Sequence, residues 1–128
     1  MAKQKVGYVD GFVLVVPKKN KEAYKKMAKE GAKVWMKYGA LSYKECVLDD
    51  AKPKFVTLTF PKLTKIKPSE EVWYSYIEYK SKTHRDQVNK KVMAEMEKYA
   101  KENPDHMKNM PFDMKKLSFG GFKVSVGS

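Results

Sequence analysis

Apolar positions alternate with polar ones, or form short runs, in several segments of the chain, and this pattern predicts β-strands. Within the first segment Asp10–Gly11 would also suit a tight hairpin turn. Because few strand-forming residues precede Asp10, we favour one strand with a bulge at Gly11, and a second bulge at Gly120–Gly121. The predicted strands cover residues 6–16, 41–48, 54–60, 71–79 and 117–126.

A helix is predicted between the first two strands, because apolar residues recur there at spacings of three and four. Asn20 is a suitable N-cap residue before it, and Gly39 is a suitable stop after it. Gly31 lies within the apolar face, which indicates close contact between the helix and the sheet. That face comprises Tyr24, Met27, Ala28, Gly31, Val34, Trp35 and Tyr38.

A second helix is predicted before the last strand. Thr83, followed three residues later by Asp86, resembles a capping box at its start, and Asn103–Pro104 ends it. Its inward positions are Val88, Val92, Met96 and Tyr99.

The order of these elements indicates the fold class. If residues 54–60 are set aside and the proline-containing stretch 61–69 is a loop, the order is β-α-β-β-α-β. Split βαβ units of this kind place two helices on one face of an antiparallel sheet. We therefore expect a single α+β domain of ferredoxin-like type over residues 1–128, since no repeat or linker interrupts the chain.

The other face of such a sheet has too few polar residues to face water. Tyr8, Phe12 and Leu14 share one phase of the first strand, and residues 71–79 carry aromatic side chains in both phases. Soluble monomers rarely expose so large an apolar patch. We therefore expect a homodimer in which two sheets pack face to face.

The positive charge of the chain raises the question whether the protein binds nucleic acid. The net charge is +12, but it comes from 26 Lys spread along the chain and one Arg, Arg85. Specific base reading favours the planar guanidinium, so specific nucleic-acid binding is not expected, and weak lysine-based binding is kept as an alternative. We interpret the lysines that recur at every fourth position as a solvated helix wall: Lys21, Lys25, Lys29, Lys33 and Lys37.

Composition also limits the kinds of site and the cellular location to be expected for the protein. One cysteine, Cys46, excludes an internal disulfide and a Cys-based structural zinc site, and we expect it to be a buried, inert thiol. No apolar run approaches the roughly 18 residues of a membrane span, and no signal-peptide hydrophobic stretch follows the first residues. We therefore expect a cytoplasmic protein without membrane association.

Several motifs occur in order along nearly the whole chain: Tyr8–Val13, Val16–Lys18, Tyr38–Leu41, Glu45–Cys46, Phe60–Pro61, His84–Asp86, Lys91–Met93, Met110–Asp113 and Gly120–Phe122. Together they resemble the bacterial YbaA-like family, domain of unknown function 1428, in the dimeric α/β-barrel superfamily. One departure is Tyr76, where the family pattern has Trp. The resemblance implies a ferredoxin-like fold that pairs into a barrel, and no assigned activity. The wider superfamily includes cofactor-independent monooxygenases, haem-degrading enzymes and lactone isomerases, whose catalytic residues match no motif here.

The candidate catalytic residues are His84, Arg85, Asp86 and Asp10. At the start of a helix His84 could transfer a proton and Arg85 could hold an anion, with Asp10 as a possible base. The structural alternative is that Asp86 caps the helix and Arg85 pairs with a carboxylate at the dimer interface.

Other candidates have strong structural alternatives. Asp10, Glu45 and Glu78 share strand phases with apolar residues, so each needs a polar partner or a wet cavity unless its strand is shifted by one residue. His84 and His106 lack metal-ligand spacing, and no phosphate-binding or coenzyme motif is present, so we expect no metal and no cofactor. The aromatic residues 73–79 could line a ligand pocket, but we favour a role in the core and the dimer contact.

The sequence therefore predicts a dimer that binds a small aromatic or anionic organic molecule between sheet and helices. Its chemistry would be proton transfer of the cofactor-independent monooxygenase or isomerase kind. The alternatives are a non-catalytic assembly homodimer and a weak nucleic-acid binder.

Overall fold

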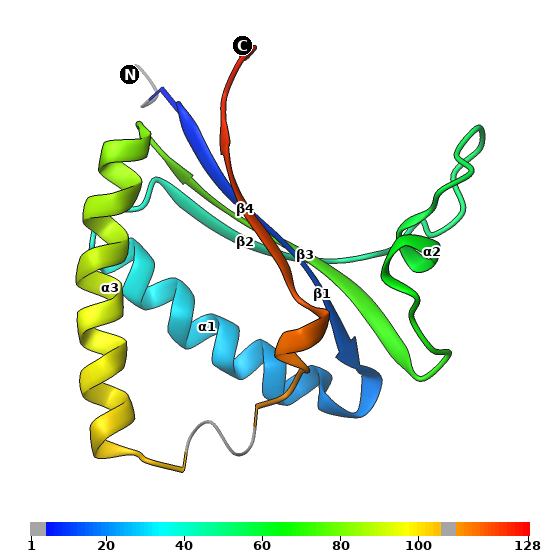
Figure 1. The fold of residues 1–128 in the computed structure, drawn as a ribbon, viewed down its shortest axis with the longest axis horizontal. Helices are drawn as coiled ribbons and strands as arrows, with labels where there is room; N and C mark the ends of the chain where they lie inside the picture. Colours follow the sequence, from blue (N-terminus) through cyan, green and yellow to red (C-terminus); the bar gives the residue numbers. More distant parts are fainter. Residues whose placement is uncertain (1–4, 106–109) are drawn as a thin grey trace.

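The structure, a computed structural model, describes residues 5–105 and 110–128. Two long helices lie on one side of a twisted four-stranded sheet (Figure 1). In chain order the elements are β1 (Tyr8–Pro17), η1 (Lys18–Asn20), α1 (Lys21–Lys37), β2 (Ser42–Val47), α2 (Phe60–Thr64), β3 (Glu70–Tyr79), α3 (Lys82–Glu102), η3 (Met114–Lys116) and β4 (Ser118–Lys123).

The sheet has the strand order β2-β3-β1-β4, and every neighbouring pair is antiparallel. With α1 between β1 and β2 and α3 between β3 and β4, this arrangement is α+β and compatible with the ferredoxin-like class. The four predicted strands other than residues 54–60 are present, and both predicted long helices are present.

The strand predicted at residues 54–60 is wrong. These residues form turns and bends that pair with no strand, and Phe60 already begins the short helix α2. Pro61 lies in the first turn of α2, where a missing N–H costs nothing, so part of the expected loop 61–69 is helical. Alternation alone does not make a strand, because a strand also needs a neighbour that takes up its backbone hydrogen bonds.

Both predicted bulges are also wrong. The registers of β1 with β3 and with β4 run without interruption through Gly11 and through Gly120–Gly121, which also excludes the hairpin turn at Asp10–Gly11. The glycines are needed for space: a Cβ on Gly121 would lie 2.3 Å from the hydroxyl of Tyr8, and one on Gly11 would lie 3.3 Å from the ring of Phe122.

Helix α1 lies at its predicted place, but two local predictions fail. Asn20 occupies the N-cap position, yet its side chain makes no cap and instead donates to the carbonyl of Pro111 at 3.1 Å. A Cβ on Gly31 would meet its nearest neighbour, the Tyr43 hydroxyl, at an ordinary 3.6 Å, so no tight approach requires this glycine. Gly39, with φ +107°, follows the helix as expected.

The core lies between the sheet and the two long helices. Even-numbered residues of β1 and odd-numbered residues of β3 point toward the helices and form two clusters of buried side chains. The prediction that Tyr8, Phe12 and Leu14 lie on the uncovered face is therefore wrong, because all three lie on the covered one. The clusters contain Tyr8, Ala40, Ile77, Tyr79, Val88 and Val92, and Leu14, Val16, Tyr24, Ala28 and Trp73.

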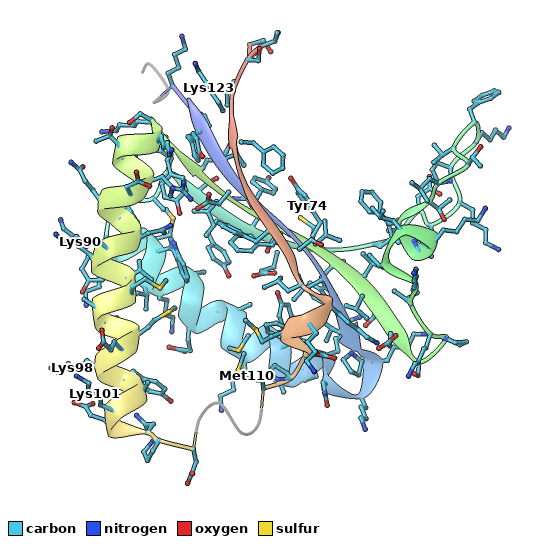
Figure 2. The ribbon with its side chains drawn as sticks, viewed as in Figure 1. Tyr74, Lys90, Lys98, Lys101, Met110 and Lys123 are labelled. Carbon is cyan, nitrogen blue, oxygen red and sulfur yellow. The ribbon has the colours of Figure 1, made fainter. Side chains whose placement is uncertain are left out.

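The opposite face of the sheet, which we call the open face, is not covered by α1 or α3. Val15 and Val72 on this face are buried, and the short helix α2 contacts β3, but other apolar side chains of the face are exposed. Tyr74 lies on this side (Figure 2), and 43% of its surface is exposed. Phe122 of β4, whose ring covers Gly11, is 62% exposed. Cys46, predicted to be buried, is exposed instead, because β2 is an edge strand.

Candidate functional site

Helix α3 places the predicted site residues beside the sheet. Its N-cap is Ser81, whose hydroxyl accepts the N–H of His84 at 3.1 Å. The capping box predicted from Thr83 and Asp86 is therefore wrong, and the helix starts one residue before Thr83. The first turn carries His84, Arg85 and Asp86, and the guanidinium of Arg85 reaches from it to β1.

Arg85 forms a largely buried ion pair with Asp10. Its Nη1 donates to Asp10 Oδ1 at 3.0 Å, and the Asp10 residue is 1% exposed. Nη2 donates to the hydroxyl of Tyr8 at 3.3 Å, while Nε lies 2.9 Å from Asp86 Oδ1. The guanidinium also lies over the Tyr8 ring, 5.0 Å from its centroid. Nη1 and Nη2 are therefore hydrogen-bonded within this chain, whereas the buried Nε pairs with Asp86 by charge and makes no hydrogen bond to the described residues.

A second layer of polar side chains surrounds Asp10. The Asn89 Oδ1 atom accepts from Trp35 Nε1 at 3.0 Å and from the Tyr79 hydroxyl at 3.3 Å. Burial raises the pKa of the Asp10 carboxyl above 3.8, and this effect outweighs the lowering by Arg85 and by hydrogen bonds from Tyr79 and Asn89. Burial and the nearby carboxylate also raise the pKa of Tyr79.

His84 does not join this network. Its Nδ1 accepts the backbone N–H of Lys80 at 2.9 Å, and its ring stands edge-on to Tyr79 with centroids 5.8 Å apart. Of the four predicted catalytic residues, the structure brings together Asp10, Arg85 and Asp86. The Nδ1 atom of His84 is already engaged. Arg85 does pair with a carboxylate, as the structural alternative predicted, but that carboxylate is the buried Asp10 of the same chain. Ser81, not Asp86, caps the helix.

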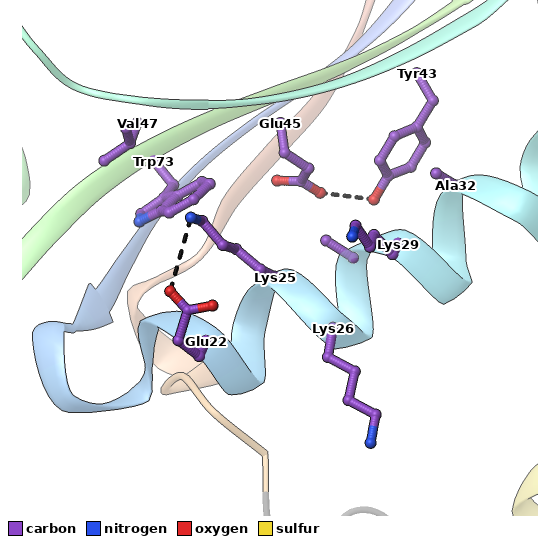
Figure 3. A pocket seen from close by; sticks show the side chains of 10 residues that line it. Glu22, Lys25, Lys26, Lys29, Ala32, Tyr43, Glu45, Val47 and Trp73 are labelled. Atoms are coloured by element: carbon purple, nitrogen blue, oxygen red, sulfur yellow. Dashed lines mark hydrogen bonds and ion pairs between the residues drawn. The ribbon is translucent and has the colours of Figure 1, made fainter.

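A groove lies elsewhere, between α1 and the β2–β3 side of the sheet (Figure 3). Its volume is about 740 Å³. Trp73, Val47 and the small residues of α1 provide apolar surface, and lysines of α1 stand along its length. The lining residues are Glu22, Lys25, Lys26, Ala28, Lys29, Ala32, Tyr43, Glu45, Val47 and Trp73.

Glu45 is held in a fixed position in this groove. Its Oε1 accepts from the Tyr24 hydroxyl and its Oε2 from the Tyr43 hydroxyl, both at 2.6 Å. Burial, reinforced by Glu45 itself, raises the pKa of both tyrosines, so both remain neutral donors. The need for a partner that the sequence indicated for Glu45 is therefore met, as it is for Glu78, which accepts from the hydroxyl of Ser42.

Lysines and an indole complete the groove. Lys25 and Lys29 rise from α1 on the side that faces the sheet, and Lys26 points away (Figure 3). The Lys25 Nζ atom also lies 3.8 Å from Glu22 Oε1. Trp73 is 4% exposed, and among the described residues its Nε1 has no hydrogen-bond partner.

The sequence pattern did not reveal this combination of residues. Lys25 and Lys29 are exposed, as the solvated helix wall predicts, but both also line the groove. The signal was present: these lysines precede Ala28 and Ala32, which are small residues that leave space on the side of the helix facing β2. Pairing that space with Glu45 required the three-dimensional arrangement of α1 and β2.

Metal and membrane features can be addressed for the described part of the chain. His106 lies outside the described residues. Within the described ranges no three His, Cys, Asp or Glu side chains gather as a metal site. No helix among them is long and apolar enough to cross a membrane.

Fold and site thus define an α+β protein with one open sheet face and a groove between helix and sheet. Residues 7–114 match the family described as "Protein of unknown function (DUF1428)", and the chain belongs to that family. Similar proteins carry the name "Uncharacterized protein YbaA" in Escherichia coli (strain K12), Escherichia coli O157:H7 and Shigella flexneri. Each is 40% identical over 121 residues, which cover 93% of this chain and 97% of the relative.

Proposed function

We propose that the protein binds a small aromatic organic anion in the groove between α1 and the sheet. The observation that carries this proposal is the groove itself, about 740 Å³ in volume, with an indole and a fixed carboxylate beside two lysines. Binding sites for small molecules are mostly apolar cavities of about 300–1,000 Å³ with a few placed polar groups.

Each part of the ligand has a counterpart in the groove. An aromatic ring would pack mainly on Val47, which is 37% exposed, since the adjacent Trp73 offers only an edge at 4% exposure. The ammonium groups of Lys25 and Lys29 would attract its anionic group, while Glu45 would accept a hydrogen bond from a hydroxyl or N–H on the same ligand. Glu45 needs no rearrangement for this, because two tyrosines already orient it.

Calorimetric titration with 2-naphthoate tests the proposal. We expect binding below millimolar concentration, and at least tenfold weaker binding of the uncharged 2-naphthylmethanol. Ala32→Leu should fill the groove and abolish binding, whereas Ala23→Leu, an exposed position of the same helix outside the groove, should leave it unchanged.

A second pair of variants tests the charge. Lys29→Gln should weaken naphthoate binding several-fold and leave the alcohol unaffected, whereas Lys33→Gln, outside the groove lining, should change neither. Equal binding by the Ala32→Leu variant and the unaltered protein would contradict the groove as the site. No binding of either compound at millimolar concentration would favour the non-catalytic assembly alternative.

Proton transfer at Asp10 is a second candidate function, of the kind used in cofactor-independent oxygenation or isomerisation. The raised pKa of this buried carboxyl supports it, since catalytic acids and bases are tuned in this way. The closed ion pair with Arg85 supports a structural role instead, and we place ligand binding first for that reason. Turnover of a bound ligand that disappears in Asp10→Asn, with ligand affinity retained, would establish the catalytic role.

The proposed assembly is a homodimer that pairs through the open faces of two sheets, as in a dimeric α/β barrel. Its support is the exposed aromatic surface of Tyr74 and Phe122 on a face that neither long helix covers. Sedimentation velocity should give a dimer at micromolar concentration. A monomer under those conditions would remove this part of the proposal.

A further inference from the structure

The segment between β2 and β3, residues 48–69, projects from the body of the molecule, and we call it the arm. Figure 1 shows it leaving the sheet on the side away from α1 and α3. Its large apolar side chains point into solvent in a single copy. They are Phe55, Val56, Leu58, Phe60 and Leu63, and Phe55 is fully exposed.

The arm is a built structure with its own hydrogen bonds. The Thr59 hydroxyl caps α2 by accepting the N–H of Lys62 at 3.4 Å, and the Lys62 ammonium donates to the carbonyl of Thr57 at 3.1 Å. The Thr64 hydroxyl donates to the carbonyl of Phe60 at 2.7 Å. These bonds and the contact of α2 with β3 fix the shape of the arm, while its apolar side chains stay between 47% and fully exposed, which is the condition of a preformed docking element.

The backbone at the tip of the arm supports the same interpretation. Phe55 has φ 69°, a left-handed conformation that is unusual for a bulky residue. Such conformations persist where surrounding contacts hold them. In a single copy the Phe55 side chain is wholly exposed, so its own chain does not supply such contacts.

We propose that the arm packs against a second copy of this chain and clamps the homodimer. This inference deepens the homodimer proposed above and rests on it. The same chain carries two uncovered apolar surfaces, the arm and the open face, and a twofold pair covers both on both copies at once. A different partner would cover only one of them in each binding event.

The size of these surfaces suits a dimer. At their observed exposures, the five apolar side chains of the arm together with Tyr74 and Phe122 offer on the order of 800 Å² per copy. Each partner contributes about 800 Å² to a stable protein–protein interface of standard size. Within that sum Tyr74 and Phe122 supply a minor part, and the arm supplies most of the area.

Sedimentation velocity between 1 and 100 μM on three variants tests the clamp. The arm variant is Phe55→Ser with Leu58→Ser, and the face variant is Phe122→Ser. The control is Met36→Ser with Met93→Ser, which removes two exposed apolar side chains from α1 and α3. We expect the arm variant to raise the dimer dissociation constant at least 100-fold, the face variant to raise it as well, and the control to stay within twofold of the unaltered protein.

The outcomes separate the two proposals. If the arm variant dimerises as tightly as the unaltered protein while the face variant dissociates, the clamp is wrong and the homodimer stands. If the unaltered protein is a monomer at 100 μM, both are wrong. If the arm variant lowers the melting temperature of a dilute, monomeric sample, the arm packs on its own chain and the clamp is overturned. Naphthoate binding in the same variants reports on the groove independently.

Discussion

Three carboxylates lie among apolar residues of the strands, and each has found a polar partner. The sequence could predict this need, because an unpaired charge on an apolar face is costly. It could not predict the partners of Asp10 and Glu45. Arg85 lies 75 positions from Asp10, and Tyr24 lies 21 positions from Glu45. Only the crossing of α3 and α1 over the sheet brings these groups together.

The raised pKa of Asp10 predicts a pH-dependent stability. Because burial raises this pKa above 3.8 in the folded state, the folded protein binds more protons than the unfolded chain between the two pKa values. The contribution of Asp10 to stability is therefore fully present below the unfolded pKa and declines as pH rises through the folded one. Asn cannot titrate, so the stability of the unaltered protein relative to Asp10→Asn should increase as pH falls from about 7 to about 4.

Urea unfolding of both proteins at several pH values measures this difference. A difference that stays constant over the range, or that shrinks toward acid, would show that Arg85 and the hydrogen bonds outweigh burial at this carboxyl. That outcome would also weaken the case for Asp10 as a proton-transfer group.

At the scale of the elements, periodicity located both long helices and four strands to within a few residues. The predictions from periodicity that are wrong share one cause, which is that they depend on contacts between residues far apart in the sequence. Residues 54–60 alternate like a strand but find no neighbour, and the glycines taken for bulges instead make room for rings from other strands. Tyr8 over Gly121 and Phe122 over Gly11 are contacts between β1 and β4, which no local pattern reveals.

The start of α3 allows a prediction that compares two substitutions, one at the cap and one beside it. Ser81 caps the helix by accepting the N–H of His84, whereas Thr83 is an exposed residue of the first turn. Ser81→Ala should lower the free energy of unfolding by about 1 kcal/mol. Thr83→Ala should change it by less than about half as much, because no cap is lost. Chemical denaturation measures both, and a larger loss for Thr83→Ala would restore the capping box inferred from sequence.

At the scale of the whole molecule, the positive charge is the feature that sequence analysis could judge best. The formal net charge of +12 is a sum over residues, so it does not depend on how the chain folds. The groove is the opposite case, because it exists only where α1, β2 and β3 meet. The sequence therefore could not reveal the groove, because its lining comes from three elements that are separate along the chain.

The charge leads to a prediction about nucleic acid. Lysine contacts to phosphates release counterions and carry no sequence information, so any duplex binding should be equal for unrelated sequences and lost between about 50 and about 200 mM salt. Fluorescence anisotropy with two labelled 20-mers of different sequence measures this. Retention of one duplex at the higher salt would require a specific interface on the protein.

The position of β1 in the middle of the sheet constrains how the chain can fold during its synthesis. Its two neighbours are β3 and β4, and Tyr8 pairs with Lys123 near the other end of the chain. During synthesis one edge of β1 thus stays unpaired until the residues of β4 have emerged from the ribosome. Contacts of such long sequence separation form slowly. During that interval the nascent protein depends on the β1–β3 pair and its covering helices to avoid joining the wrong strand.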